Sequence, residues 1–294
     1  MSGAPPFRRA VILGTGLIGG SFGLALRKFL PEIRVVGWNR GDRAREALAT
    51  GAVQEAFSGD LASALKDADL IYVALPIGAI LDQLPEIMRL AAPGALVTDA
   101  ASTKLRICRL ADELAASAPG KGPLMLPGHP MAGKEVAGIA HADADLFQRT
   151  TYALVAREQL REDPRVRSFV SLVERIGARR LWIGPEQHDR AVALSSHLPQ
   201  IIAVALASFL YDRLDENGLP VTLAGPGLRD SLRLAGSSYS TWRDILLTNR
   251  DNIAGALDLL SCRLDDIREH LASRELEADF DAANELYKLL RDLK

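Results

Sequence analysis

His129 is the residue whose surroundings most clearly suggest chemistry. It lies within Pro127-Gly128-His129-Pro130-Met131-Ala132-Gly133, after a short strand predicted at Leu124 to Leu126. So many prolines and glycines do not fit a helix or a central strand, so the pattern predicts that His129 lies in a rigid loop. An imidazole titrates near neutral pH and can accept a proton there, although a loop histidine bonded to a backbone carbonyl is the alternative.

A second candidate site is the glycine pattern Gly14-Thr15-Gly16-Leu17-Ile18-Gly19. An apolar run from Ala10 to Leu13 precedes it and apolar residues at helical spacing follow it, so it joins a predicted strand to a predicted helix. There Gly14 permits a tight turn, Gly16 lets a pyrophosphate approach the backbone, and Gly19 lets the helix pack on the strand. The pattern predicts a dinucleotide site that includes Leu17 and Ile18; a tight turn without a ligand is the alternative.

Residues that follow the second predicted strand, Ile33 to Gly37, should distinguish NAD from NADP, because dinucleotide-binding folds contact the adenosine ribose there. An acidic side chain there would accept hydrogen bonds from a 2′-hydroxyl, but this chain has Asn39, followed by Arg40 and Arg43. The two arginines could pair with a 2′-phosphate, which favours NADP over NAD. Solvated arginines opening the next helix are the alternative, and the nearby Asp42 weakens the preference.

Further strands predicted at Leu70 to Leu75 and Ala95 to Thr98 alternate with helical patterns. This alternation predicts an α/β fold with a doubly wound, Rossmann-type parallel sheet. Ligands bind at the carboxyl ends of such strands, so residues that follow strands are expected to contact the cofactor. These residues are Leu75, Pro76, Ser102 and Thr103. Capping of the next helix by Ser102 or Thr103 is compatible with that role.

The pattern changes near residue 184. Strand signals end with Tyr152 to Ala156 and Arg180 to Ile183, and only helical patterns follow. We therefore expect a dinucleotide-binding domain at residues 1–184 and an all-helical substrate and dimerisation domain at residues 185–294. Its longest predicted helix, from Glu186 to about Leu214, is apolar on most faces and should be buried by other helices, often those of a second subunit.

Composition argues for an ordinary folded protein of the cytoplasm. The 35 basic and 37 acidic residues are interspersed and give a net charge of -2, which argues against nucleic acid and membrane surfaces as partners. Cys108 and Cys262 lie far apart and no secretory signal pattern is present, so both are expected to be core thiols in a reducing compartment. The apolar run Leu198 to Leu210 is too short to span a bilayer, and no metal site is indicated.

A series of motifs along the chain carries a resemblance. In order, they are Gly14 to Gly19, Asp99-Ala100-Ala101-Ser102-Thr103-Lys104, Gly128-His129-Pro130-Met131-Ala132-Gly133, Ser196-His197-Leu198-Pro199, Leu228-Arg229-Asp230-Ser231-Leu232-Arg233 and Trp242-Arg243-Asp244-Ile245. Together they resemble the prephenate and arogenate dehydrogenases of tyrosine biosynthesis. The resemblance implies NAD(P)-dependent oxidative decarboxylation of a small cyclohexadienyl acid by a homodimer joined through its C-terminal helices. Hydride leaves the carbon that bears the ring hydroxyl, carbon dioxide is lost, and the ring becomes aromatic.

The same resemblance assigns roles to individual residues. His129 matches the catalytic histidine, expected to accept the hydrogen bond of the ring hydroxyl, and Ser102 is similar to the serine that bonds the same hydroxyl and histidine. Arg233 matches the arginine that pairs with a substrate carboxylate, and Arg229 is the competing candidate. Asp230 would orient Arg233 through the three-residue helical spacing.

Residues at the mouth of the site bear on substrate choice. Lys134 and Glu135 stand where the family places such residues. Relatives that use prephenate often carry a second histidine where this chain has Gln200. Loss of a cationic partner favours arogenate, which brings its own ammonium. His197 either supports the site or is a satisfied helix-core histidine, and Trp242 is expected to pack rather than bind.

Two other function classes stay open at this point. A β-hydroxyacid-type dehydrogenase would need a catalytic lysine on the helix from Glu186 to Leu214, which contains none. A nicotinamide-binding regulator would keep the fold without catalysis, but intact His129, Ser102 and Arg233 argue against it.

Overall fold

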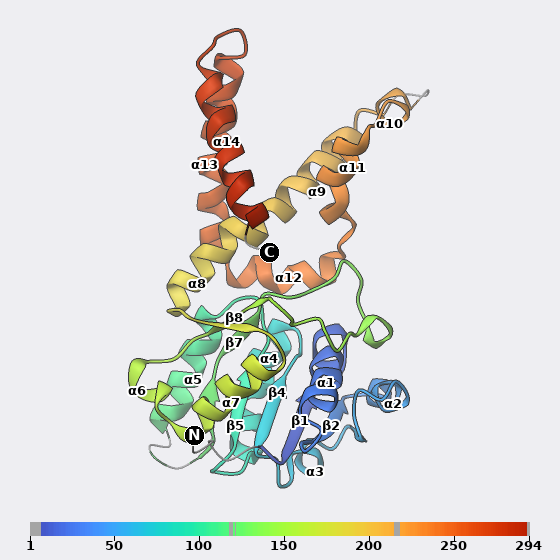
Figure 1. The fold of residues 1–294 in the computed structure, drawn as a ribbon, viewed down its shortest axis with the longest axis vertical. Coiled ribbons are helices and arrows are strands. Elements are labelled where there is room, and N and C mark those ends of the chain that lie inside the picture. Colours follow the sequence, from blue (N-terminus) through green and yellow to red (C-terminus); the bar gives the residue numbers. More distant parts are fainter. Residues whose placement is uncertain (1–6, 118–119, 121, 215–217, 293–294) are drawn as a thin grey trace.

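The computed structural model describes residues 7–117, 120, 122–214 and 218–292, arranged as an α/β part with a helical part above it (Figure 1). A six-stranded sheet has the order β3-β2-β1-β4-β5-β6, and every neighbouring pair is parallel. This confirms the Rossmann-type fold predicted from the alternating pattern. The strands are β1 (Arg9–Leu13), β2 (Arg34–Asn39), β3 (Glu55–Ser58), β4 (Leu70–Val73), β5 (Leu96–Asp99) and β6 (Leu124–Leu126); β3 was not predicted.

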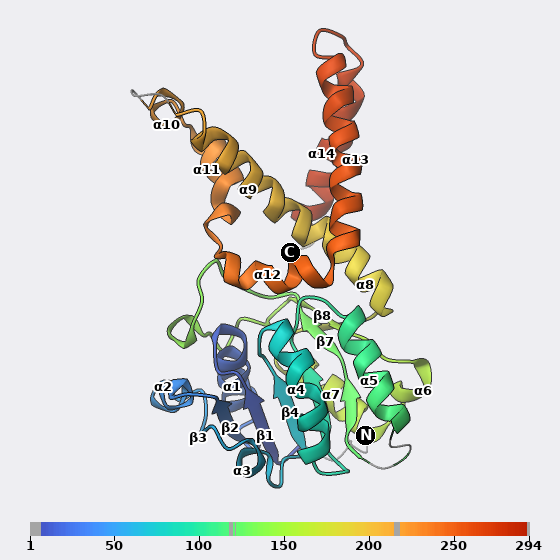
Figure 2. The same ribbon diagram turned by 180° about the vertical axis from the view of Figure 1, so that it is seen from behind.

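Successive residues of a strand point to opposite faces of the sheet, so its apolar strands present apolar side chains on both faces. Helices bury both of these faces. In β1, Ala10 and Ile12 face one apolar cluster, while Val11 and Leu13 face the other. Figure 1 shows α7 in front of the sheet, and Figure 2 shows α4 and α5 in front of its other face. The helices of this part are α1 (Leu17–Phe29), α2 (Arg43–Ala49), α3 (Leu61–Leu65), α4 (Ile77–Leu90), α5 (Leu105–Ser117), α6 (Glu158–Arg161) and α7 (Pro164–Arg175).

A second, small sheet holds the histidine segment. It has the order β7 (Gly128–Pro130), β8 (Thr151–Leu154) and β9 (Arg179–Trp182), with β7 antiparallel to β8. His129 pairs with Ala153 in this ladder, so the prediction of a loop around His129 was wrong. Because β7 lies at the sheet edge, one side of its backbone needs no ladder partner, and the flanking prolines are tolerated.

The helical part begins with one continuous helical run, Pro185–Tyr211, as the sequence predicted, but a π-helical segment lies within it. Its first helix α8 (Pro185–Val192) passes into a π-helical segment, Ala193–His197, before α9 (Leu198–Tyr211). Pro199 explains the interruption, since it has no N–H to donate to the carbonyl four residues earlier. The remaining helices are α10 (Leu219–Thr222), α11 (Pro226–Leu232), α12 (Tyr239–Thr248), α13 (Arg250–Glu269) and α14 (Leu276–Asp292).

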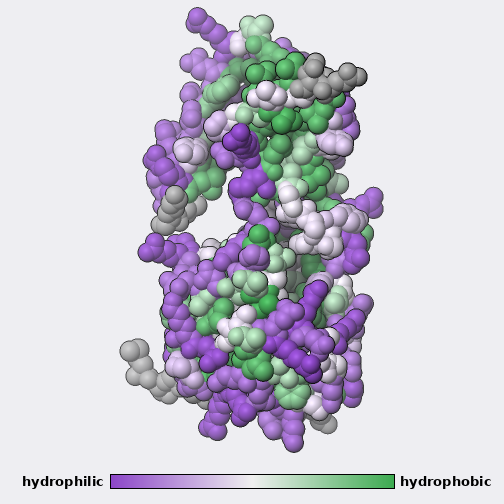
Figure 3. Space-filling view, turned by 90° about the vertical axis from the view of Figure 1, so that its right-hand side faces the viewer, coloured by the Kyte–Doolittle hydropathy of each residue, from purple (hydrophilic) through white to green (hydrophobic). Residues whose placement is uncertain are grey.

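These helices form two diverging arms, with α9 to α11 in one and α13 and α14 in the other (Figure 1). The arms leave large apolar side chains exposed: Phe209 is 50% and Tyr211 75% exposed, so the chain itself does not bury this part of α9. Figure 3 shows hydrophobic side chains gathered over this upper part. Further exposed apolar residues of the arms are Val204, Leu259, Leu264, Phe280, Leu286, Tyr287, Leu289 and Leu290.

The segment Pro185–Tyr211 also has the length and mean hydropathy, 1.6, that a membrane span would need. In the structure, however, this segment packs against the rest of the protein: its polar residues His188, Asp189 and His197 are buried, and α9 contacts α13. Of the two free cysteines, Cys108 is half-buried, but Cys262 is exposed on α13, so the prediction of a core thiol was wrong there.

Candidate active site

The glycine loop between β1 and α1 forms an open cradle at a helix N-terminus. A side chain at Gly14, whose φ is +92°, would lie 2.5 Å from the Ala74 carbonyl oxygen, and one at Gly19 would overlap the Gly14 carbonyl oxygen. A Cβ at Gly16 would meet nothing within 4 Å, so space remains over the first turn of α1, which holds no acidic residue. Free N–H groups, the helix dipole and open space together fit a pyrophosphate.

The end of β2 is tied to this loop through Asn39. Its Oδ1 accepts hydrogen bonds from the Thr15 hydroxyl at 2.6 Å and the Thr15 N–H at 3.3 Å. Arg40 is exposed and lines a pocket of about 320 Å³ together with Trp38 and Arg89, while Arg43 begins α2 on the surface. The two predicted arginines are therefore both accessible at the end of β2.

The residues predicted at the ends of β4 and β5 lie in different surroundings. Leu75 borders Gly14, and Pro76 precedes α4 and is exposed. Ser102 is half-buried in the turn after β5, and its hydroxyl has no hydrogen-bond partner among the described residues. The Thr103 hydroxyl is buried and lies 2.8 Å from the Thr248 hydroxyl of α12, which joins this turn to the helical part.

A fully buried ion pair holds the backbone beside His129. The Lys104 ammonium pairs with Asp99 and donates to the Gly128 carbonyl at 2.7 Å, while Asp99 accepts from the Gly128 N–H at 3.1 Å and the Ala101 N–H at 2.9 Å. Both ionic side chains are 0% exposed. Because the peptide groups on both sides of Gly128 are engaged, β7 is fixed against the end of β5.

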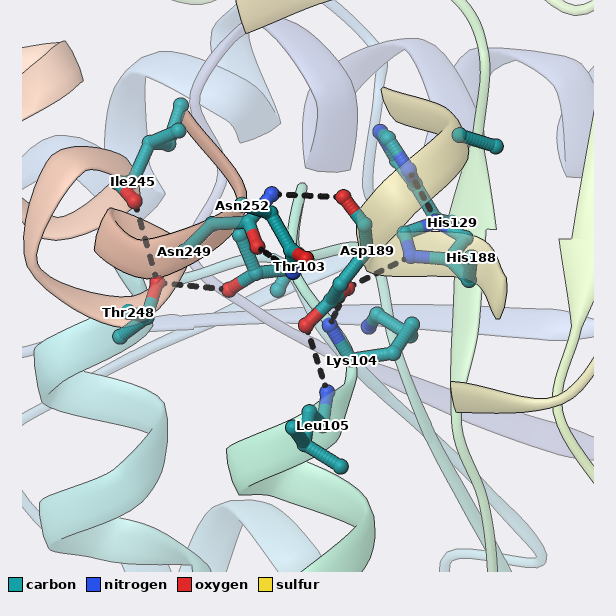
Figure 4. Close-up of polar contacts among 12 residues, drawn as sticks. Thr103, Lys104, Leu105, His129, His188, Asp189, Ile245, Thr248, Asn249 and Asn252 are labelled. Atoms are coloured by element: carbon teal, nitrogen blue, oxygen red, sulfur yellow. Dashed lines mark hydrogen bonds and ion pairs between the residues drawn. The ribbon is translucent and has the colours of Figure 1, made fainter. Parts of the chain in front are cut away.

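The His129 side chain lies in a chain of three buried polar groups (Figure 4). Its Nδ1 lies 2.9 Å from His188 Nε2, and His188 Nδ1 lies 2.8 Å from the Asp189 carboxylate. Asp189 in turn accepts from the backbone N–H groups of Lys104, at 2.7 Å, and Leu105, at 3.0 Å, where α5 begins. Asp189, rather than Ser102 or Thr103, therefore caps α5.

The electrostatics keep His129 neutral. Burial, the nearby Lys104 ammonium, and the two other imidazoles, of His188 and His197, lower the pKa of His129 well below its ordinary 6.5. A neutral imidazole has one nitrogen with a free lone pair, which is the state required to accept a hydrogen bond or a proton. Among the described residues, no group of His, Cys, Asp and Glu is placed to hold a metal ion.

His197 is bound within the helical part. It is 1% exposed, its Nδ1 lies 3.1 Å from Asn249 Nδ2, and its ring packs edge-on against Trp242 at 5.8 Å between centroids. Burial lowers the pKa of His197 to about 4, against an opposing effect of the Asp189 charge. Asn249 also donates to the Asp189 backbone carbonyl at 2.7 Å, so it links His197 to the middle of α8.

The predicted substrate residues are partly exposed and ion-paired, as for Arg233, Glu135 and Lys134, and partly buried, as for Gln200. Arg233, at the end of α11, forms an ion pair with Glu135, which follows β7 by a few residues; this is the partner the structure gives it, and Asp230 is exposed one turn earlier. Lys134 instead bonds the His141 carbonyl and Asp143, both at 3.1 Å. Gln200 is buried, and its amide donates to the Leu234 carbonyl at 2.8 Å, next to Arg233.

The sequence did not single out His188, Asp189 or Asn249. They come from helices far along the chain, and an adjacent His-Asp pair in a polar first turn has no distinguishing pattern. The only available signal was the resemblance around Asp99 and Lys104, which marked the turn that Asp189 caps but not Asp189 itself.

A pyrophosphate cradle after β1 and a buried, neutral histidine after β6 are typical of a nicotinamide-dependent dehydrogenase. The comparisons identify the family. Residues 22–181 match the family model of the prephenate dehydrogenase nucleotide-binding domain, and residues 184–291 match that of the prephenate dehydrogenase dimerization domain. The chain belongs to the prephenate dehydrogenase family, as the sequence motifs predicted.

Similar proteins agree with this assignment. Prephenate dehydrogenases from Lactococcus lactis and Bacillus subtilis are each 31% identical, over 92% and 91% of this chain and 73% and 71% of their own lengths. Arogenate dehydrogenase from Synechocystis superposes with a TM-score of 0.73 at 28% identity, covering 97% of this chain and 96% of that one. A prephenate dehydrogenase from A. aeolicus, in complex with hydroxyphenyl propionate and NAD+, shares the fold with a TM-score of 0.84 at 23% identity over 98% of each chain.

The buried ion pair gives a stability prediction. Lys104→Met should lower the free energy of unfolding by about 3–5 kcal/mol, because it leaves the Asp99 carboxylate buried without its counter-charge. Lys288→Met is the matched control, since its pair with Glu285 is on the surface and should change stability by less than about 1 kcal/mol. Urea denaturation of both variants measures the difference, and equal losses of stability would contradict the role given to Lys104.

Proposed function

We propose that this enzyme catalyses NAD(P)-dependent oxidative decarboxylation of a cyclohexadienyl acid in tyrosine biosynthesis. The reaction converts arogenate to tyrosine, prephenate to 4-hydroxyphenylpyruvate, or both. The observation that carries the proposal is the neutral His129, fixed by buried partners at the carboxyl edge of the sheet where a dinucleotide binds. Family membership and the names of the relatives support it.

Few protein groups are needed, because aromatisation of the ring supplies the driving force. The bound nicotinamide supplies the acceptor for the hydride that leaves the hydroxyl-bearing carbon. His129 takes the hydroxyl proton at its free nitrogen as the hydride departs, which prevents positive charge from building up on the ring oxygen. When carbon dioxide leaves, the bonding electrons enter the ring, and His129 returns the proton to the resulting phenolate. Ser102, half-buried in the turn after β5, supplies a second hydrogen bond to the same oxygen.

Arg233 binds a substrate carboxylate in this proposal, because its guanidinium fork matches two carboxylate oxygens. Its pairing with Glu135 supports the assignment, since the ion pair brings the segment after β7 and the end of α11 together. Asp230 and Lys134 add charge around this entrance, and Gln200 fixes the turn that carries Arg233. Arogenate is the favoured substrate, because a neutral Gln200 and the Glu135 carboxylate suit a ligand that carries an ammonium.

NADP is the favoured cofactor. The amide of Asn39 is engaged by Thr15, so no carboxylate stands at the end of β2 to accept the ribose hydroxyls. Arg40 and Arg43 are exposed beside it and can approach a 2′-phosphate. The Gly14 to Gly19 loop, which includes Leu17 and Ile18, would hold the pyrophosphate of either cofactor, and the turn with Ser102 and Thr103 would border its nicotinamide side.

We also propose a cytoplasmic homodimer, with cofactor binding at residues 1–184 and substrate binding and dimerisation at residues 185–294. The match to a dimerization domain supports the dimer, and the exposed apolar side chains of α9, α13 and α14 supply a surface for it. The change from β9 to α8 supports the boundary. The two free cysteines fit a reducing compartment.

Initial rates with arogenate or prephenate, each with NAD or NADP, test the function directly. We expect turnover with at least one cyclohexadienyl acid, and the highest kcat/KM for arogenate with NADP. A preference for prephenate with NAD would overturn both specificity proposals and leave the reaction class intact. Cofactor binding without turnover of either acid would instead favour a regulator.

His129→Asn should lower kcat by about 100-fold or more while cofactor affinity is retained. Because the pKa of His129 is lowered, the wild-type enzyme should keep its kcat/KM from about pH 8 down through pH 6.5, losing it only when the imidazole is protonated well below that. A pH profile that falls with a midpoint at or above 6.5 would contradict a buried neutral base. His141→Gln, at an exposed histidine of the same segment, is the control.

The dimer surface is tested by placing charged side chains on its exposed apolar residues. Leu286→Glu with Leu290→Glu places two carboxylates one turn apart on exposed α14, and should convert a wild-type dimer to a monomer at micromolar concentration. Leu48→Glu, an exposed leucine of α2, should leave the dimer intact. Light scattering after size-exclusion chromatography reports the mass, and a dimer retained by the α14 variant would move the interface elsewhere.

A further inference from the structure

The three-group chain at His129 determines which of its two nitrogens carries hydrogen. We propose that His188 and Asp189 are positioning residues that hold His129 as its Nδ1–H tautomer and thereby leave Nε2 as the atom that accepts the substrate proton. The part that names a substrate proton rests on the proposed function; the tautomer itself does not.

Asp189 fixes the first hydrogen. Its carboxylate is 1% exposed and accepts two backbone N–H groups at the start of α5, those of Lys104 and Leu105. Burial opposes ionisation, but the hydrogen bonds from His188 and from these two N–H groups outweigh it and lower the pKa of Asp189. The carboxylate is therefore ionised, and an ionised carboxylate only accepts hydrogen bonds.

His188 must then donate to Asp189. Its Nδ1, 2.8 Å from the carboxylate, carries the hydrogen, so in the neutral ring Nε2 holds the lone pair. This Nε2 lies 2.9 Å from His129 Nδ1. A neutral His188 bonded in this way accepts at that contact, so His129 Nδ1 donates, and the remaining nitrogen of the neutral His129 ring, Nε2, is unprotonated.

The free nitrogen is also the accessible one. His129 is 9% exposed, and its Nε2 has no hydrogen-bond partner among the described residues. Four side-chain atoms of the described chain are fully buried without a hydrogen-bond partner, and His129 Nε2 is not among them. His129 Nε2 is therefore not fully buried, and it is the nitrogen that a substrate hydroxyl can approach.

The chain also stabilises the protonated state that forms during the reaction. When Nε2 receives the hydroxyl proton, the Nδ1–H of the imidazolium points at the His188 lone pair, and His188 remains bonded to the Asp189 charge. No proton has to leave Nδ1. The Lys104 ammonium and His197 oppose a positive charge on His129. Asp99 is paired with Lys104, whereas Asp189 is linked to His129 by hydrogen bonds through His188.

The arrangement couples the two parts of the molecule. His188 and Asp189 belong to α8, whereas His129 belongs to β7 and the capped N–H groups belong to α5 (Figure 4). Asn249, which opens α13, holds the Asp189 backbone carbonyl at 2.7 Å. The tautomer of the histidine in the cofactor-binding part is thus set by the first helix of the helical part.

The direct test is nitrogen-15 NMR of the histidine rings in the intact protein, whose 5 histidines make the spectrum simple. The His129 signals are assigned by their loss in His129→Asn. We expect a protonated Nδ1 and an unprotonated Nε2 at neutral pH. A protonated Nε2 would overturn the proposal. The measurement needs no substrate, so it remains decisive if the proposed reaction fails, and turnover with the wrong tautomer would overturn this inference alone.

Two substitutions of one residue separate positioning from packing. In His188→Gln, the side-chain carbonyl can still accept from His129 Nδ1, so the tautomer should persist and kcat should fall less than about 10-fold. His188→Leu fills a similar volume without an acceptor, so the Nδ1–H state should no longer dominate and kcat should fall about 100-fold with KM little changed. Equal kcat values and an unchanged tautomer in both variants would overturn the proposal.

The control is His141→Gln, which makes the same substitution at an exposed histidine and should change neither the tautomer of His129 nor kcat. If His188→Leu fails to fold, Asp189→Asn provides the second variant. It removes the negative charge while retaining shape, and should shift the acid limb of kcat/KM to lower pH, because protonated His129 loses its nearby counter-charge. An unchanged acid limb would overturn the role of Asp189.

Discussion

The buried pair of Lys104 and Asp99 is the interaction on which the site depends. Removing both charges from water costs several kcal/mol per ion, and mutual attraction offsets this only where hydrogen bonds engage their remaining capacity. Here that capacity is met by the two peptide groups of Gly128 and the N–H of Ala101. The desolvated pair can therefore exist only with β7 in place, which makes the position of His129 a condition of the pair's own stability.

This arrangement explains why the site keeps its histidine neutral although a carboxylate lies two hydrogen bonds away. Lys104 is close enough to oppose protonation of His129, and Asp99 is bonded to Lys104 rather than to the imidazole. Asp189 orients the ring through His188 without direct contact. His129 is therefore held in a fixed orientation while its imidazole stays neutral.

The sequence predicted what is local and missed what the fold assembles. The glycine loop was predictable because Gly14, Gly16 and Gly19 act within one strand–turn–helix unit, and the buried parallel strands were readable as apolar runs. β3 was missed because Glu55–Ser58 is only half-buried and lacks such a run. His188, Asp189 and Asn249 could not be found, since each matters only through partners brought together from elsewhere. The loop prediction for His129 failed because an edge strand tolerates prolines that a central strand does not.

The helical arms place a further demand on the molecule. The arms are widely separated in Figure 1, and at least half of the surface of three large side chains is exposed: 50% for Phe209, 75% for Tyr211 and 66% for Tyr287. Apolar surface of this extent stabilises a chain only when it leaves water. Arg233 and Gln200 lie on the same arm as the exposed face of α9, and Gln200 holds the Leu234 carbonyl next to Arg233. The ion pair of Arg233 with Glu135 and the exposed apolar face of α9 therefore belong to the same arm of the helical part.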